Sequence, residues 1–579
     1  MKKTMFLWTL MATMAVVTAC SAQDPYSEFQ SYIDSKGTGG TGAISGSNGT
    51  MSASSGELLT FSIDIDKTTA EPSSAVSEYF PDEEDNLDNN SFATEVAIDL
   101  SNPTAKTENG VTISVNGGHI TANHASTKGI CYVLSGETSN GSFTVLGDKK
   151  YEVKLNGVSI NNPDSAALNL LSGKRAYVVV ADGTNNKLTD GTSSKNDHKG
   201  ALYCKGKLLF NGSGTLEVYG NYNNGIHSAD YIVFRKGNNI YAKSTANHGI
   251  KANDGIFING GIINVETTAE AAKGINCESH IIVNGGRTTV ITTGNGTYDT
   301  TDKEAKGAAG IKADSTFTMN AGLVKLKSSG SGGKGLKADC PSTINGGELY
   351  VITTGSQYSG NGDTASPKGI KVDDNLTING GTVMVRTTGR NGEGIESKAT
   401  LTINDGNVMV SAYDDAVNSA GDLYIKGGNV TVVGTQNDGL DANGNMYISG
   451  GNIVAYGASG AEAGIDIDER HQLYITGGNI FGIGGRVDGT LGSTSQGIIS
   501  TSGSVQANGT VSVSNGSTAI VSFTMPPYSY NSGSIMISSP NIKSGTSYTL
   551  TLGSNTQTVT ASNSVSSSMG GGFPGGGRW

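Results

Sequence analysis

The chain has 579 residues, of which 84 are glycine, about twice the usual share, while only 16% are charged and the formal net charge is −12. The glycines follow no Gly-X-Y period, which excludes collagen, and the lack of a basic excess removes any general case for nucleic acid as a partner. So uneven a composition over this length favours one extended repetitive body with appendages over several ordinary domains.

Residues 1–19 have the pattern of a bacterial lipoprotein signal peptide. Lys2 and Lys3 provide a positive end, a short apolar stretch follows, and small residues lead to Cys20. Lipidation of Cys20 would anchor the chain to a membrane, and the apolar stretch is too short to span one. We therefore expect a cell-envelope protein attached to the outer membrane by lipid alone, on its periplasmic or cell-surface face. A plain secretory leader with an incidental cysteine is the alternative.

Residues 20–95 are expected to form a tether and an N-terminal lead-in. The stretch TGGTGAISGSNG is typical of a flexible linker, and an acidic run covers Asp82 to Asp85. The other cysteines of the chain are widely spaced and form no CxxC pattern, so zinc is not expected. Buried thiols are the default interpretation, and disulfides after export are the alternative, for Cys131, Cys204, Cys277 and Cys340.

The next part of the chain repeats one motif with a period of about 25 residues. The clearest copy is KGIKVDDNLTINGGTVMVRTT at 368–388, and related copies begin at Gly249, Gly274, Gly335 and Gly439. In the copy at 368–388 apolar residues alternate with polar ones in three short runs, which is the pattern of strands with one buried face. Asn-Gly-Gly supplies the positive-φ positions of a tight corner, and its asparagine can form a ladder with the next copy.

Three short strands in each repeat predict a triangular coil whose backbone pairs with the coils above and below. We therefore predict an all-β fold, a right-handed single-stranded parallel β-helix over residues 96–500, with its earliest copy at VTISVNGGHITAN (111–123). Residues 501–562 are expected to form a small C-terminal β cap, and residues 563–579 a glycine-rich disordered tail. A propeller and a leucine-rich repeat fit the period and the apolar pattern less well.

Stacking turns each position of the repeat into a column of side chains about 4.8 Å apart. In two columns beside the Gly-Ile or Gly-Leu turn, the side chains are mostly basic in the earlier repeats and mostly acidic from about Glu393 onward. Lys312, Lys337 and Lys371 each have an aspartate two positions later, so surface ion pairs are the simpler interpretation. A groove that holds acidic sugars is the alternative.

The acidic half of these columns has fewer basic neighbours. Aspartate and asparagine on adjacent coils offer the oxygen ligands that Ca²⁺ prefers, without an EF-hand loop. We predict calcium ligands among Asp414, Asp415, Asp438, Asp441, Asp466 and Asp468. A solvated acidic face is the alternative, and no P-loop or HExxH motif is present.

The motifs together resemble the carbohydrate-binding β-helix proteins of anaerobic bacteria, a family typified by a clostridial cellulose- and polygalacturonate-binding protein. The resemblance covers about 96–500 and includes YVLSG (132–136), VADGTNNKLTDG (180–191), LLFNGSGTLEVYGNYNNGI (208–226) and NDGLDANG (437–444). It implies a calcium-bearing β-helix similar in fold to pectate lyases, with polysaccharide binding as its role. The chain departs from the family at His227-Ser228-Ala229, where Ser-Lys-Asp is frequent.

We favour a monomeric binding protein that holds a plant-type or acidic polysaccharide along the β-helix edge with the help of calcium. Candidate carbohydrate-binding residues are Lys337, Lys368, Lys371, Tyr413 and Tyr447. A polysaccharide lyase acting on a uronate-containing glycan is the enzymatic alternative, since a cation and a lysine base are the groups that such a reaction needs. A structural or adhesive surface protein is the third possibility.

Overall fold

A computed structural model of the chain describes residues 57–68, 70–72, 76–486 and 490–564. The predicted signal peptide, Cys20, the predicted linker and most of the glycine-rich tail lie outside these residues. No helix in the described ranges is long and apolar enough to cross a membrane.

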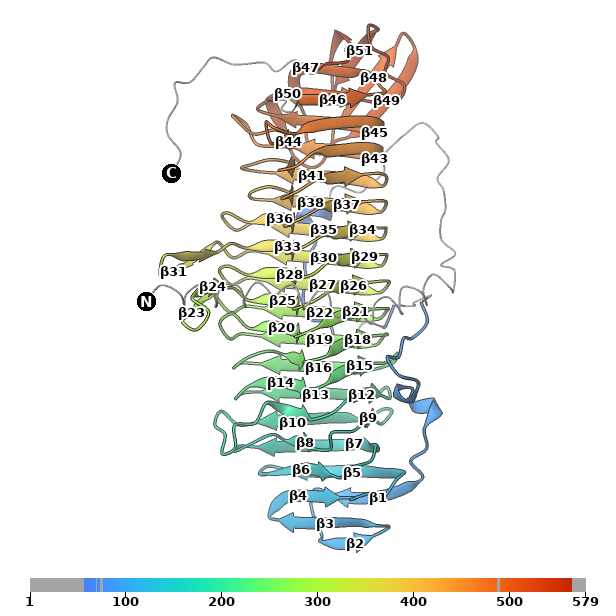
Figure 1. The fold of residues 1–579 in the computed structure, drawn as a ribbon, viewed down its shortest axis with the longest axis vertical. Helices are drawn as coiled ribbons and strands as arrows, with labels where there is room; N and C mark the ends of the chain where they lie inside the picture. Colours follow the sequence, from blue (N-terminus) through green and yellow to red (C-terminus); the bar gives the residue numbers. More distant parts are fainter. Residues whose placement is uncertain (1–56, 69, 73–75, 487–489, 565–579) are drawn as a thin grey trace, which may run out of the picture. The chain divides into compact units, whose positions relative to one another are not determined.

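The body is a stack of parallel coils, each made of three short strands (Figure 1). In one coil these are β33 (Lys368–Val372), β34 (Leu376–Ile378) and β35 (Thr382–Thr387). β33 pairs in parallel with β28 (Lys334–Ala338) of the preceding coil and with β36 (Glu393–Ser397) of the following one. The prediction of an all-β, right-handed parallel β-helix is confirmed.

The interior of the stack is filled by the apolar residues of the alternating pattern. Ile370, Leu376 and Val383 of this coil are almost wholly inaccessible to solvent, and equivalent residues above and below continue one core. Each coil buries its apolar side only against its neighbours, so the stack is stable as a whole and needs closed ends. Three cysteines, Cys131, Cys204 and Cys277, are buried free thiols.

Asn-Gly-Gly forms the corner between the second and third strands, as the sequence predicts. The second glycine has a positive φ, for example +82° at Gly347 and +80° at Gly381. The asparagine amides form a ladder in which Asn345 donates to Asn320 over 2.8 Å and Asn379 donates to Asn345 over 2.7 Å. These bonds fix the register of successive coils at the corner.

Both ends of the stack are closed by antiparallel strands. At the N-terminal end β3 (Val111–Asn116) and β4 (Gly118–Asn123) form a hairpin around Gly117. The Asn-Gly-Gly of residues 116–118 is therefore a hairpin turn, and the prediction that 111–123 is the first copy of the coil motif was wrong there, because β3 reverses direction. At the C-terminal end β48 (Thr510–Asn515), β49 (Thr518–Thr524), β51 (Ser547–Leu552) and β52 (Asn555–Thr560) form the predicted cap.

The described part of the lead-in lies along one face of the stack (Figure 1). It begins with α3 (Glu57–Thr60), where Leu58 packs on Met384 and Met409. Further on, Glu78 bonds to Arg235, and Asp85 accepts a bond from Arg175 over 2.8 Å. The acidic run of residues 82–85 is therefore an anchor for the lead-in.

Candidate functional site

A hollow of about 790 Å³ lies on the face formed by the first strand of each coil. Its floor consists of β20 (Lys273–Cys277), β25 (Ala309–Ala313), β28 and β33. Eight lysines line it, together with six carboxylate side chains, and none of the lining residues is arginine. We call this hollow the lysine groove; its lysines are Lys273, Lys306, Lys312, Lys334, Lys337, Lys368, Lys371 and Lys398.

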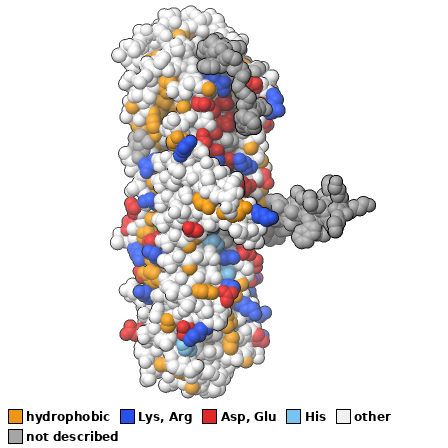
Figure 2. All heavy atoms as spheres, turned by 90° about the vertical axis from the view of Figure 1, so that its left-hand side faces the viewer, with side chains coloured by type: hydrophobic (Ala, Val, Ile, Leu, Met, Phe, Trp, Pro, Cys, Tyr) orange, Lys and Arg blue, Asp and Glu red, His pale blue; other side chains and the backbone are white. Residues whose placement is uncertain are grey.

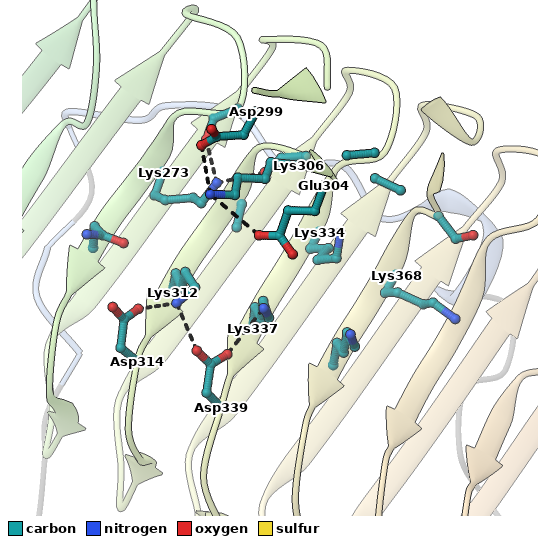
Figure 3. A pocket seen from close by; sticks show the side chains of 18 of the residues that line it. Lys273, Asp299, Glu304, Lys306, Lys312, Asp314, Lys334, Lys337, Asp339 and Lys368 are labelled. Carbon is teal, nitrogen blue, oxygen red and sulfur yellow. Dashed lines mark hydrogen bonds and ion pairs between the residues drawn. The ribbon is translucent and has the colours of Figure 1, made fainter. Parts of the chain in front are cut away.

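Two hairpins inserted at coil corners form a wall of the groove. They are β23 (Thr297–Asp299) with β24 (Glu304–Lys306), and β31 (Tyr358–Gly360) with β32 (Asp363–Ala365), which project at the left of Figure 1. The backbone N–H of Ala305 donates to the Asp363 carboxylate over 2.7 Å and joins the two hairpins. Lys306 bonds to Asp299 over 2.8 Å, so its charge is neutralised within its own hairpin (Figure 3).

The outer column of the groove stands two positions after the turn glycine, and its lysines are ion-paired. Lys312 contacts Asp314 of its own coil and Asp339 of the next over 3.1 Å (Figure 3). Lys337 likewise lies 3.2 Å from Asp339. Burial alone would lower the pKa of Lys337, but Asp339 and Asp373 outweigh it and raise the pKa. The ion pairs expected from the sequence are confirmed, so the outer column is largely self-neutralised.

The inner column stands directly before the turn glycine, and two of its lysines lack such partners. Lys273 donates to the carbonyl of Gly307 over 2.7 Å and to that of Ala271, and Lys334 donates to the carbonyl of Gly332 over 3.2 Å. Neither makes an ion pair with any carboxylate in the described residues. Burial, with the nearby lysine charges, lowers the pKa of Lys273 and of Lys334 to about 7.

The columns change sign at Lys368. Its ammonium lies 2.5 Å from Glu393 and 3.2 Å from Glu396, and Lys398 adds a further contact to Glu396. The predicted binding residues Lys337, Lys368 and Lys371 are thus all engaged in ion pairs, the last with Asp373 over 2.9 Å. Their role in binding stays a prediction, and the lysines with unpaired charge are their inner-column neighbours.

Beyond Lys368 the columns carry an acidic stripe, which we define as Glu393, Asp415, Asp438, Asp441 and Asp466. Acidic side chains gather in the upper part of the face shown in Figure 2. Burial, reinforced by neighbouring carboxylates, raises the pKa of Asp415 to about 6, of Asp438 to about 7 and of Asp441 to about 8. The crowding of these carboxyl groups therefore favours their protonated form near neutral pH.

The predicted calcium ligands are only partly brought together. Asp415, Asp438, Asp441 and Asp466 perturb one another across successive coils, and Asp414 adjoins Asp415. Asp468 lies apart from them and bonds to Arg470 over 3.1 Å. Within the described ranges, no three acidic, histidine or cysteine side chains are gathered closely enough to hold a metal as they stand. The oxygen donors suit calcium, and Glu393 Oε2 is buried without a hydrogen-bond partner.

The two tyrosines predicted to stack on sugars lie in different structural environments. Tyr447 lies between Tyr424 and Tyr474, with ring centroids 4.7 and 4.8 Å apart and planes within 6° of parallel. Both faces of the Tyr447 ring are covered by these neighbours, so only its edge is open to a ligand. Tyr413 is half-buried beside Asp414, next to the acidic stripe.

Sequence reasoning passed over Lys273 and Lys334. The spacing does not single them out, because Lys368 of the same column is also followed two positions later by an apolar residue, Ile370, and is nevertheless ion-paired.

Comparisons with known proteins place the chain in a family. A family profile described as "Carbohydrate-binding domain-containing protein" matches residues 108–273, 329–416 and 388–576. A protein of that name from Acetivibrio thermocellus is 31% identical over 120 residues, which are 19% of this chain and 42% of the relative. The match thus spans about two fifths of the length of that relative.

A solved structure described as a polysaccharide lyase-like protein from C. thermocellum, a gadolinium derivative, is 24% identical. It covers 43% of this chain and 96% of its own, with a TM-score of 0.36. The segments matched by the family profile make up well over half of the chain. This protein belongs to the carbohydrate-binding domain-containing protein family.

Proposed function

We propose that the protein binds an acidic polysaccharide in the lysine groove. The observation that carries the proposal is the pair Lys273 and Lys334, two half-buried ammonium groups without carboxylate partners in the described residues. An unpaired charge that is partly buried destabilises a fold. Two such charges in an open groove are explained if a ligand of opposite charge pairs with them. Membership of a carbohydrate-binding family supports a glycan as that ligand.

A polymer suits this groove better than a small molecule. The lysines stand on successive coils, about 4.8 Å apart along the stack, so the positive charge is repeated along a line. A polysaccharide with uronate groups presents negative charge with a similar regularity. The two hairpins would then flank the chain on one side of the groove.

Calcium at the acidic stripe is the second part of the proposal. Asp415, Asp438 and Asp441 would hold the ion, with Asp414 and Asp466 beside them, after small side-chain rotations. The mutual repulsion of these carboxylates and the unpartnered Glu393 Oε2 support this assignment. A bound calcium ion would supply positive charge that neutralises the stripe and bridges it to carboxylates of the glycan.

We also propose that Cys20 carries a lipid that holds the protein in the cell envelope. The leader pattern of residues 1–19 supports this. Replacement of Cys20 by alanine in the producing cell should release the protein into the soluble fraction and abolish incorporation of labelled fatty acid. Continued labelling of the variant would show that the lipid is attached elsewhere.

A polysaccharide lyase remains the second candidate, on one observation. Lysines with a pKa of about 7 are partly unprotonated at neutral pH, so Lys273 and Lys334 have the basicity that removal of a proton beside a uronate requires. Binding alone does not need this property.

The test uses the mature protein, begun after Cys20, on immobilised polygalacturonate, cellulose and a neutral soluble glycan, with and without a chelator. Wild type is expected to be retained on polygalacturonate, and Lys334→Met to be retained less. Lys243→Met is the matched control, because Lys243 lies on another face, where it pairs with Glu266 over 3.4 Å. Retention on no acidic glycan would overturn the proposal and favour a structural role, and unsaturated uronide products absorbing in the ultraviolet would establish the lyase.

A further inference from the structure

The inner column of the lysine groove has one gap. In the register of the strands Lys273 is followed by Ala309 and then by Lys334, so a buried alanine lies between two lysines. The two lysine backbones are two coils apart, about 10 Å, and both side chains are long enough to reach the space over the alanine. Lys312, on the same strand as Ala309, borders this space from the outer column.

The charges around the gap do not cancel. Four lysines surround it, Lys273, Lys312, Lys334 and Lys337, and their positive charges lower the pKa of Lys273 beyond the effect of burial. Two of the four are matched by Asp314 and Asp339. The arrangement therefore leaves Lys273 and Lys334 without a carboxylate partner among the described residues, on either side of the small side chain of Ala309.

The hydrogen-bond donors indicate the shape of the anion. An ammonium group has three N–H donors. Lys273 uses two on the carbonyls of Ala271 and Gly307, and Lys334 uses one on the carbonyl of Gly332. Within the described part of the chain this leaves three donors, on two amines from different coils. A sulfate ester has three terminal oxygens, one for each.

The kind of basic side chain in the groove also favours a tetrahedral anion. The two-pronged guanidinium of arginine matches both carboxylate and phosphate, whereas separate lysines act as point charges that can approach a tetrahedral oxyanion from different directions. Apart from His248, the basic residues that line the groove are lysines. Resting on the proposed binding of an acidic glycan, we infer that the space over Ala309 is a subsite for a tetrahedral oxyanion, supplied by a sulfate ester of that glycan.

The experiment compares chondroitin sulfate with unsulfated chondroitin, and with polygalacturonate, by calorimetry at one ionic strength. We expect chondroitin sulfate to bind at least about tenfold more tightly than chondroitin. Ala309→Met fills the gap without changing the charge and should abolish this preference while leaving the weaker binding of chondroitin. Lys273→Met with Lys334→Met should abolish it too, and Lys243→Met should not.

A measurement on the wild type alone keeps the inference testable if the variants fail to fold. Inorganic sulfate or phosphate, added against chloride at constant ionic strength, should weaken the binding of chondroitin sulfate more than the binding of polygalacturonate. Equal affinity for the sulfated and unsulfated polymers would overturn the subsite and leave the proposed function standing. Binding of none of the three polymers would overturn both, and binding of inorganic sulfate alone would keep the oxyanion subsite but overturn its assignment to a glycan.

Discussion

Replacement of Lys334 by methionine should make the folded protein more stable at neutral pH. The ammonium of Lys334 is half-buried, has no carboxylate partner in the described residues, and makes one bond, of 3.2 Å, to the Gly332 carbonyl. Methionine has a similar length and no charge, so it removes an electrostatic cost and leaves the packing largely unchanged. The change in stability should depend on pH in a way that identifies its cause.

The pKa of Lys334 is 10.5 in the unfolded chain and about 7 in the folded one. Each unit of this difference corresponds to about 1.4 kcal/mol, which gives a ceiling of about 5 kcal/mol. Because the ammonium stays in contact with water in the groove, we expect on the order of 2 kcal/mol. Between the two pKa values the unfolded chain binds more protons than the folded one, so the stability of the wild type rises with pH in this window. The advantage of the variant is therefore complete below about pH 7 and vanishes toward pH 10.5.

The assay is unfolding in urea, followed by circular dichroism at about pH 6.5 and about pH 10. Urea is preferable to guanidinium chloride, because the latter is a salt and screens the charges under test. Lys243→Met, at an ion-paired lysine on another face, should show no such pH-dependent gain. An advantage of Lys334→Met that is equal at both pH values, or a loss at both, would refute the electrostatic reasoning.

Three further predictions concern the acidic stripe, the corner ladder and the lead-in. Asp441→Asn should stabilise the protein by on the order of 3 kcal/mol near pH 8 and little near pH 4. The reason is that the raised pKa of Asp441 makes the stability of the wild type fall as pH rises through this range. Added calcium should raise the urea midpoint of the wild type more than that of the variant. Asn345→Ala interrupts the amide ladder and should cost about 1 kcal/mol, with faster hydrogen exchange confined to the adjoining corners. Arg175→Met leaves the buried Asp85 without its cation and should cost about 3 kcal/mol, so that limited proteolysis cuts the lead-in first; unchanged cleavage would contradict this anchor.

The fold class could be predicted because the residues that specify each strand and each corner lie close together in the sequence. Alternation around Ile370 and Val383 specifies buried strands, and the Asn-Gly-Gly corners require the positive φ seen at Gly347 and Gly381. The prediction that the same motif at Gly117 is a coil corner is wrong, because β3 and β4 pair in antiparallel fashion there. A tight turn has the same sequence pattern whether the next strand continues the coil or runs back along the strand before it. Only the pairing partner distinguishes the two cases.

The candidate site was less accessible to sequence reasoning. The columns and their change of sign follow from the register, and the ion pair of Lys371 with Asp373 follows from spacing. Which charges remain unpaired depends on contacts between residues far apart in the sequence, such as the hairpin carbonyl of Gly307 that accepts from Lys273. The covering of the Tyr447 ring likewise depends on rings of neighbouring coils, since a column of tyrosines can present faces or edges.

The lead-in has a consequence for how the stack unfolds. A β-helix is close to a one-dimensional array, in which coils at one end can open without disturbing those at the other. Here one segment contacts Arg175, then Arg235, and finally Met384, so it crosses many coils in succession. Opening any of these coils also requires detaching the segment that joins it to the others. We therefore expect this part of the stack to unfold as one cooperative unit, and not coil by coil from its ends.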